Sequence, residues 1–531
     1  MKFCKHLCMT VLALALGGLA LSAQAAVTEL IIRSTTPYGV FAGGRFVRID
    51  GEVRGALAPT EAIADIDKPA RDASGRVPYR TQFTLLMPET VAAGNAALLV
   101  DVVNRGRAIA HAFYNSPRAR PILTGSLDEG TGFLQNRGYA VVAVQWELAE
   151  GIEPPTFVDA QGDKKYVEGV GFAAVRDIAA FFRDNDTAAN PLARRIERVY
   201  AVGYSQTARL LKTFLAQGFN EFDGKRVFDA LHLVAGTAGV LPLNASGKGP
   251  GSVASATPGP ANAELRGVHE EPFTYAEVMQ RLREKNRSVP LIMVTNMNTD
   301  YLSTRTSLIR TGAGGTAEAP IPGNVRMYDI AGAAHMNVRA KDQACDEEHG
   351  QLDWSPALRA QLAALDEWAR GRAEPPANRL MPLEPNRGDP KVLAAPTFLP
   401  AASVLVPRID AAGNSLGGVR LPDFEVALGQ HGDLNSPMTN GTCRLAGSYR
   451  PFAKTAAERQ ARGDPRPSIE ERYPDGINEY TTRIRQAARA LVADRLLLEE
   501  DSVVIQNAAA ENPLFAPSQA RARGALAGAQ R

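Results

Sequence analysis

The feature that most constrains the fold is an alternation between short apolar runs and segments with helical spacing, which begins near residue 96. Two runs, at residues 97–103 and 140–146, have the continuous apolar character of strands buried on both faces, and further strands are predicted at residues 198–203, 230–235, 291–295 and 325–330. Helical spacing lies between them at residues 172–182 and 207–217, and Gly218 is placed to end the second helix. Buried strands that alternate with helices predict an α/β fold with a mostly parallel central sheet.

The segments around this pattern suggest a division of the chain. Residues 26–95 are predicted to be β-rich, because residues 47–54 alternate between apolar and charged side chains. Residues 96–345 form the core, with an insertion at 237–290 that begins rich in Gly, Pro, Ala and Ser and ends helix-like. We expect this insertion either to cover the active-site edge or to be a surface loop.

Residues 346–531 are predicted to form a C-terminal extension packed on the core. It contains hairpin-like pieces at 408–421, a helix start signal at residues 468–471 and a helix-like run over 480–498.

The first 25 residues are typical of a secretory signal peptide. Basic residues precede an apolar stretch, and Ala23-Gln24-Ala25 is a small-x-small cleavage signature. We therefore expect an exported protein, periplasmic or secreted, with no membrane span in the mature chain. Two of the four cysteines leave with the signal, and the remaining pair, Cys345 and Cys443, is a disulfide candidate, with buried free thiols as the alternative.

The charge balance argues against a nucleic-acid partner, because Lys and Arg number 59 against 57 Asp and Glu, a formal net charge of +2. We expect a small-molecule or acyl-ester substrate instead. No cofactor or metal is expected, since soft ligands are few and His349 beside Asp346–Glu348 is typical of a solvated acidic run.

Two serines compete as the nucleophile. The pattern Gly-x-Ser-x-Gly occurs literally at residues 413–417. Ser415, however, lies among turn-forming residues, with no predicted strand directly before it and no predicted helix directly after it. Ser205, in Gly203-Tyr204-Ser205-Gln206-Thr207, follows a predicted strand and precedes a predicted helix, which is the context that a nucleophile elbow requires. We predict Ser205 as the nucleophile, although Thr207 replaces the usual second glycine; an N-cap serine on an ordinary turn is the alternative.

A serine nucleophile needs a histidine base and an acid that orients it, in the chain order Ser, Asp or Glu, His. His335 follows the strand at 325–330 within small residues, and Asp300 follows the strand at 291–295. We predict the triad Ser205, Asp300 and His335, with Asp329 as a weaker rival acid because it lies inside a strand. Asp300 as a helix cap and His335 as a surface histidine are the structural alternatives.

The oxyanion of the tetrahedral intermediate needs backbone N–H donors. Gln206, directly after the nucleophile, is predicted to supply one. The loop at residues 104–107 is predicted to supply the second through Gly106 and Arg107, with a plain turn glycine at Gly106 as the alternative.

With these residues in place, the chain resembles the alpha/beta-hydrolase superfamily, and more narrowly a family of exported bacterial alpha/beta-hydrolase domain proteins. The similar stretches are residues 103–106, 203–206 with the helix through 220, 410–422 and 463–473. The resemblance implies a serine hydrolase fold and assigns the turn around Ser415 to structure.

The main hypothesis is therefore a serine hydrolase, carboxylesterase-like, that acts through an acyl-enzyme. An amide or peptide hydrolase would use the same triad, and a catalytically inactive hydrolase fold that binds a ligand is a further alternative. A dinucleotide-dependent oxidoreductase would depend only on the glycines at 312–315, which follow no predicted strand.

Overall fold

The structure is a computed structural model that describes residues 26–118, 120–148, 150–167, 169–241, 272–337, 344–386, 388–389, 392 and 404–515. The predicted signal peptide and residues 242–271 of the predicted insertion lie outside the described residues.

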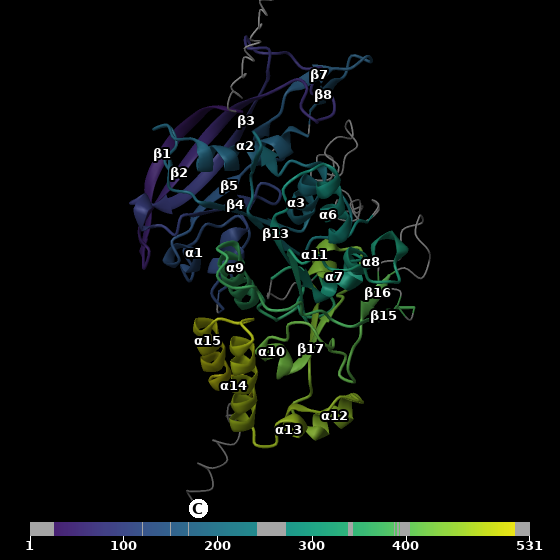
Figure 1. Cartoon of the computed structure of the whole chain (residues 1–531). Helices are drawn as coiled ribbons and strands as arrows, with labels where there is room; N and C mark the ends of the chain where they lie inside the picture. Colours follow the sequence, from purple (N-terminus) through teal and green to yellow (C-terminus); the bar gives the residue numbers. More distant parts are fainter. Residues whose placement is uncertain are drawn as a thin grey trace, which may run out of the picture.

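A single large sheet forms the centre of the molecule (Figure 1). Its strands follow the order β1-β2-β3-β5-β4-β9-β12-β13-β14, and the short β6 (Ile152–Glu153) pairs with β3. The first three strands, β1 (Val27–Phe41), β2 (Gly44–Leu57) and β3 (Val77–Pro88), are antiparallel to one another, and β3 is antiparallel to β5. The β-rich N-terminal segment thus extends the same sheet as the core.

From β5 onward the strands are parallel, as the sequence predicts. They are β4 (Ala97–Val102), β5 (Ala140–Val144), β9 (Arg198–Tyr204), β12 (Ala230–Val234), β13 (Leu291–Met297) and β14 (Val325–Ile330). Every residue of β4 and β12 is buried, which explains why apolar residues follow one another there rather than alternate with polar ones. The two exceptions, Asp101 and His232, are buried and hydrogen-bonded. The chain has the predicted α/β architecture, a mostly parallel sheet between helices.

Helices cover both faces of the parallel strands. On one face α2 (Val170–Asp184), α3 (Gln206–Gln217) and α6 (Tyr275–Glu284) bury apolar side chains in a shared core. On the other face α9 (Ser355–Ala369) and the short π-helix η2 (His111–Asn115) belong to a second core. Gly218 ends α3 in a left-handed conformation (φ 92°), as its position in the sequence predicts.

The C-terminal residues gather at one end of the molecule and contact the sheet edge through backbone bridges such as Ile330 to Val419 (Figure 1). Two small antiparallel pairs form there, β15 (Leu383–Pro385) with β16 (Leu405–Pro407) and β17 (Gly429–Asp433) with β18 (Ser448–Pro451). The expected hairpin at 408–421 is reduced to an isolated bridge between Ile409 and Ser415, followed by the short helix α10 (Pro422–Glu425).

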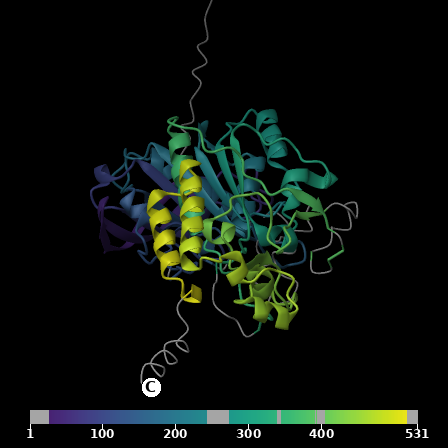
Figure 2. The same ribbon diagram turned by 90° about the horizontal axis from the view of Figure 1, so that it is seen from below.

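The helix expected over 480–498 is wrong at its C-terminal end. Helix α14 (Ile477–Ala493) stops before Arg495, whose positive φ of 59° turns the chain back, and α15 (Glu499–Ala510) begins soon afterwards. The two helices lie side by side (Figure 2) and bury Ile484 and Ile505 in the same core. Burial of both apolar faces therefore takes precedence over continuation of one helix.

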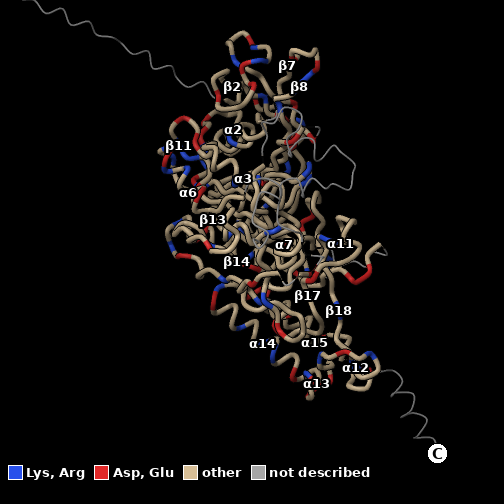
Figure 3. The backbone as a smooth tube through the Cα atoms, turned by 90° about the vertical axis from the view of Figure 1, so that its right-hand side faces the viewer, with Lys and Arg blue, Asp and Glu red and all other residues tan. Residues whose placement is uncertain are grey.

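Positive and negative side chains are interspersed along the chain rather than segregated by sign (Figure 3). Among the described residues, no helix combines the length and the apolar character needed to cross a bilayer. The predicted disulfide is present, with Cys345 and Cys443 joined at 2.05 Å.

Candidate active site

Ser205 occupies a sharp strand-to-helix turn between β9 and α3. Its backbone has φ 52° and ψ −109°, a conformation that a residue with a Cβ rarely adopts, and such strain clusters at functional sites. Gly203 makes the turn possible, because a Cβ at that position would lie 2.6 Å from the Thr207 carbonyl oxygen. The local structure is that of a nucleophile elbow.

Thr207 replaces the second glycine of the usual elbow pattern without disturbing the turn. Its side chain is fully buried, and its Oγ1 accepts a hydrogen bond of 2.9 Å from the Tyr204 N–H. The hydroxyl thus gives the Tyr204 N–H a hydrogen-bond acceptor. With a glycine at position 207, this N–H would need another acceptor.

His335 and Asp300 meet beside this elbow. His335 follows β14, and Asp300 lies in the first turn of α7 (Asn298–Ser303), directly after β13. His335 Nδ1 is 2.7 Å from Asp300 Oδ1, and both side chains are buried. The sequence order of the predicted triad therefore corresponds to neighbouring positions in space.

Two further contacts fix the backbone of His335. Its N–H donates to Thr299 Oγ1 at 2.8 Å, and its carbonyl oxygen accepts from the Tyr204 hydroxyl at 2.7 Å. The Tyr204 ring also lies over the imidazole, with ring centroids 4.9 Å apart. Sequence reasoning did not identify Tyr204 or Thr299 as positioning residues, and only their adjacency to Ser205 and Asp300 in the chain hinted at such a role.

The alternatives for the acid are resolved by hydrogen bonding. The N-cap position of α7 is Met297, so Asp300 is not the capping residue. Asp329 accepts from the Asn296 side chain and the Tyr301 hydroxyl, each at 2.9 Å, and from the Met381 N–H at 2.8 Å. Burial raises the pKa of Asp329, although these donors and Arg310 oppose the shift. Asp329 is thus part of a structural network in the core.

Ser205 and His335 open onto one cavity of about 360 Å³. Most of its wall is apolar and comes from Ala112, Phe113, Ile122, Leu123, Trp354 and Leu445. Leu445 belongs to α11 (Gly441–Ala446), so the C-terminal region contributes to the site. The cavity is of the size and character that suits a small organic substrate.

Gln206, predicted to supply the first oxyanion donor, is the first residue of α3. The initial N–H groups of a helix have no intrahelical partner, which leaves this one available at the positive end of the helix dipole. The Gln206 side chain points to a different contact, donating to Glu147 Oε1 at 3.0 Å.

The loop predicted to supply the second donor is a tight turn. The Asn104 N–H donates to the Arg107 carbonyl at 2.9 Å, and the Arg107 N–H returns a bond of 3.0 Å to Asn104. Because its N–H is engaged in the turn, Arg107 is a poor oxyanion donor. Gly106 has a positive φ of 71°, and a Cβ there would lie 2.5 Å from the Glu150 carboxylate. The turn and its close contact with Glu150 therefore require a glycine at this position. The oxyanion role of this loop stays a prediction.

The literal Gly-x-Ser-x-Gly motif lies elsewhere, and no histidine that the structure describes is hydrogen-bonded to its serine. Ser415 is 1% exposed, and among the described residues its hydroxyl has no hydrogen-bond partner. It shares a cavity with His431, but no hydrogen bond joins the two side chains. Within the part of the chain that the structure describes, Ser415 has no activating base, and its motif lies in a turn closed by an isolated bridge to Ile409.

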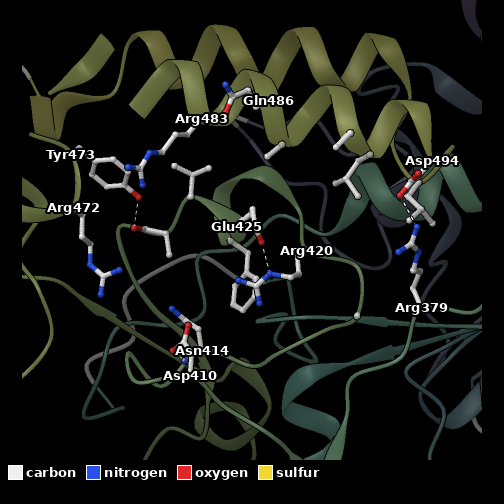
Figure 4. A pocket seen from close by; sticks show the side chains of 18 residues that line it. Arg379, Asp410, Asn414, Arg420, Glu425, Arg472, Tyr473, Arg483, Gln486 and Asp494 are labelled. Carbon is white, nitrogen blue, oxygen red and sulfur yellow. Dashed lines mark hydrogen bonds and ion pairs between the residues drawn. The ribbon is translucent and has the colours of Figure 1, made fainter. Parts of the chain in front are cut away.

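A larger groove of about 700 Å³ lies between α14 and the segment 410–427 (Figure 4). Arg379 pairs with Asp494 at 2.6 Å there, and Arg420 pairs with Glu425. No serine, cysteine or histidine is among its described lining residues. The described lining of this groove therefore offers no pair of nucleophile and histidine base.

No group of three or more His, Cys, Asp or Glu side chains that could hold a metal ion is found among the described residues. His349 is buried, with Nε2 3.4 Å from Cys345 Sγ, rather than on a solvated surface.

A parallel sheet with a strained serine between strand and helix, beside a buried His–Asp pair, defines the class of α/β hydrolases. The chain belongs to the family described as "Alpha/beta hydrolase domain", whose model matches residues 59–506.

Solved structures with a partly similar fold include an S-formylglutathione hydrolase from Staphylococcus aureus, at 9% identity and a TM-score of 0.26, covering 57% of this chain and 91% of that one. A carboxylesterase from Lactobacillus plantarum matches at 12% identity and a TM-score of 0.23, covering 41% of this chain and 68% of that one. None of the curated protein sequences matches the chain.

Proposed function

We propose that the protein is a serine hydrolase that cleaves carboxylic esters through an acyl-enzyme. The observation that carries this proposal is the pair of His335 Nδ1 and Asp300 Oδ1, 2.7 Å apart, at the cavity that Ser205 also lines. A buried aspartate in this position holds the imidazole in one tautomer and stabilises its protonated form.

In the proposed reaction the Ser205 hydroxyl attacks the ester carbonyl while His335 Nε2 accepts its proton. The Gln206 N–H stabilises the oxyanion that forms, because it stands at the start of α3 where negative charge is favoured. His335 then protonates the departing alcohol oxygen, which leaves an acyl group on Ser205. Water, deprotonated by the same histidine, releases the acid and restores the serine.

Export is part of the proposal. The predicted signal peptide would direct the chain out of the cytosol, and a disulfide between Cys345 and Cys443 is compatible with an oxidising compartment. N-terminal sequencing of the protein recovered from culture supernatant and periplasm would test this, with a mature chain that begins at Ala26 as the expected result.

The activity is tested by intact-mass analysis after treatment with a fluorophosphonate probe. We expect one adduct on the wild type and on Ser415→Ala, and none on Ser205→Ala. Ser415→Ala is a matched control, because it removes the hydroxyl of the literal motif. Loss of the adduct only in Ser415→Ala would contradict the assignment, and no adduct on folded wild type would favour a binding protein. A matched ester and amide of one acid would then separate esterase from amidase activity.

A further inference from the structure

The cavity beside Ser205 carries positive charge on one side only. Arg105 and Arg107 line it, and no Asp or Glu is among the lining residues that the structure describes. Arg107 is the exposed residue of the two, and its charge is the one that a ligand in the cavity would encounter.

Both arginines stand on the turn at residues 104–107, which is fastened to the elbow. The Asn104 side chain donates to the Tyr204 carbonyl at 2.6 Å, and the Gln145 side chain donates to the Gly106 carbonyl at 3.1 Å. Because Tyr204 precedes the nucleophile, the turn holds a fixed position relative to Ser205. The arginine side chains thus start from a preorganised base.

The turn contains an arginine in a strained backbone conformation. Arg105 has a φ of 52°, a left-handed conformation that Gly, Asn or Asp would adopt at lower cost. Strained residues persist where function requires the side chain. Arg194, Arg305 and Arg495 have a similar positive φ, however, so the strain at Arg105 marks a tight turn beside the cavity, and the proposal depends on Arg107.

Arg107 offers a guanidinium for a ligand. Its side chain is exposed and packs along Gly125, where a Cβ would lie 3.4 Å from Arg107 Cγ. Among the described residues, no carboxylate forms an ion pair with it. A guanidinium has a planar set of donors that matches the oxygens of a carboxylate or a phosphate.

We propose that the protein selects esters that carry a second, anionic group, a carboxylate or a phosphate, which Arg107 binds with Arg105 beside it. The apolar wall formed by Phe113, Ile122 and Leu445 then accepts the carbon body of the same substrate. This inference rests on the proposed ester hydrolase function and adds the substrate class.

The test compares kcat/KM for three phenyl acetates that differ only in their para substituent. 4-Acetoxybenzoate and 4-acetoxyphenyl phosphate carry an anion there, and 4-acetoxybenzamide is the neutral comparison. Monophenyl glutarate and its neutral amide repeat the comparison on the acyl side. We expect kcat/KM of at least one anionic ester to exceed that of its neutral match by about tenfold or more. The preferred ester then shows whether the anion is a carboxylate or a phosphate, and whether it lies on the acyl or the alcohol side of the substrate. The preference should fall in 0.5 M NaCl, because an exposed charge pair is screened.

In Arg107→Gln we expect the anionic-to-neutral ratio of kcat/KM to fall by about tenfold, with partial recovery in Arg107→Lys, which keeps the charge but loses the planar fork. Arg485→Gln is the matched control, because Arg485 is exposed on α14 and the substitution removes the same charge away from the cavity. Its ratio should equal that of the wild type.

The two failures are distinguishable. If fluorophosphonate labels Ser205 and neutral esters are hydrolysed, but the ratio is one or lower or is unchanged in Arg107→Gln, the substrate class is wrong and the hydrolase assignment stands. If the folded wild type neither reacts with the probe nor hydrolyses any of these esters, both proposals are overturned.

Discussion

The disulfide between Cys345 and Cys443 joins α11, which lines the cavity beside Ser205, to the chain segment that follows His335, so its removal should reveal how the C-terminal region supports the proposed site. Cys443 lies in α11, from which Gly441, Thr442 and Leu445 line the cavity. Cys345 follows the loop that carries His335. We consider the double variant Cys345→Ala and Cys443→Ala, since alanine leaves no buried hydroxyl without a partner.

The magnitude follows from the length of chain that the disulfide closes. The two cysteines are separated by 98 residues, and cross-linking a loop of that length lowers the entropy of the unfolded chain by an equivalent of about 4–5 kcal/mol. We therefore expect the double variant to lose about 3–5 kcal/mol of unfolding free energy. The native structure should change less, because the Met336 N–H donates to the Leu445 carbonyl at 3.1 Å and continues to hold α11.

The assay is urea unfolding followed by circular dichroism, with ester hydrolysis measured at 25 °C on the folded protein. Wild type with a reductant should reproduce the stability of the double variant, and thiol titration of the unfolded, unreduced wild type should find no reactive thiol. A loss below about 1 kcal/mol would refute the loop-entropy argument. Activity that disappears while the protein stays folded would show that the backbone contacts do not hold α11 alone.

Three further predictions concern the triad and the core. In Asp300→Asn we expect kcat to fall by about 10⁴-fold with unchanged circular dichroism, because the amide favours the wrong tautomer of His335; a fall below tenfold would assign the orienting role to another group. In Tyr204→Phe the hydrogen bond of 2.7 Å to the His335 carbonyl is lost, and we expect kcat to fall about tenfold with little change in KM; rates equal to wild type would make this contact purely structural. Burial lowers the pKa of Lys212 to about 7, below the 10.5 of an exposed lysine, so the unfolded chain binds more protons between these values and stability should rise with pH from about 7 to 10. Lys212→Met should weaken this pH dependence and cost about 1–3 kcal/mol, measured by urea unfolding at several pH values, because the Ala238 carbonyl loses a donor at 2.6 Å; an unchanged slope would contradict the pKa shift.

The elements that could be predicted from the sequence are those whose signal is local. Mostly apolar runs predicted the parallel strands, because both faces of β4 and β12 are buried. The choice of Ser205 over Ser415 came from the strand before and the helix after, and the structure places that strained turn where this context indicated. Asp300 and His335 each follow a strand, and the carboxyl ends of parallel strands lie at one edge of the sheet.

The features that could not be predicted depend on contacts between distant segments. The engagement of the Arg107 N–H is visible only when the turn at residues 104–107 closes on Asn104. Likewise, β15 finds its partner β16 across an intervening stretch of chain, and α14 ends where burial against α15 becomes more favourable than a longer helix. None of these outcomes has a periodic signature in the sequence.

The position of the cavity wall shows why the triad alone does not define the site. Ser205, Asp300 and His335 follow three strands of the parallel sheet, but the apolar lining of the cavity includes Leu445, from a helix more than a hundred residues further along the chain. The same helix carries Cys443, so the disulfide also ties one wall of the cavity to the chain segment after His335. In the proposed enzyme the segments that follow the strands supply the groups for the chemistry, while the turn at residues 104–107 and α11 shape what reaches them. Substitutions in those two segments should change substrate preference more than they change the reactivity of Ser205 toward a fluorophosphonate.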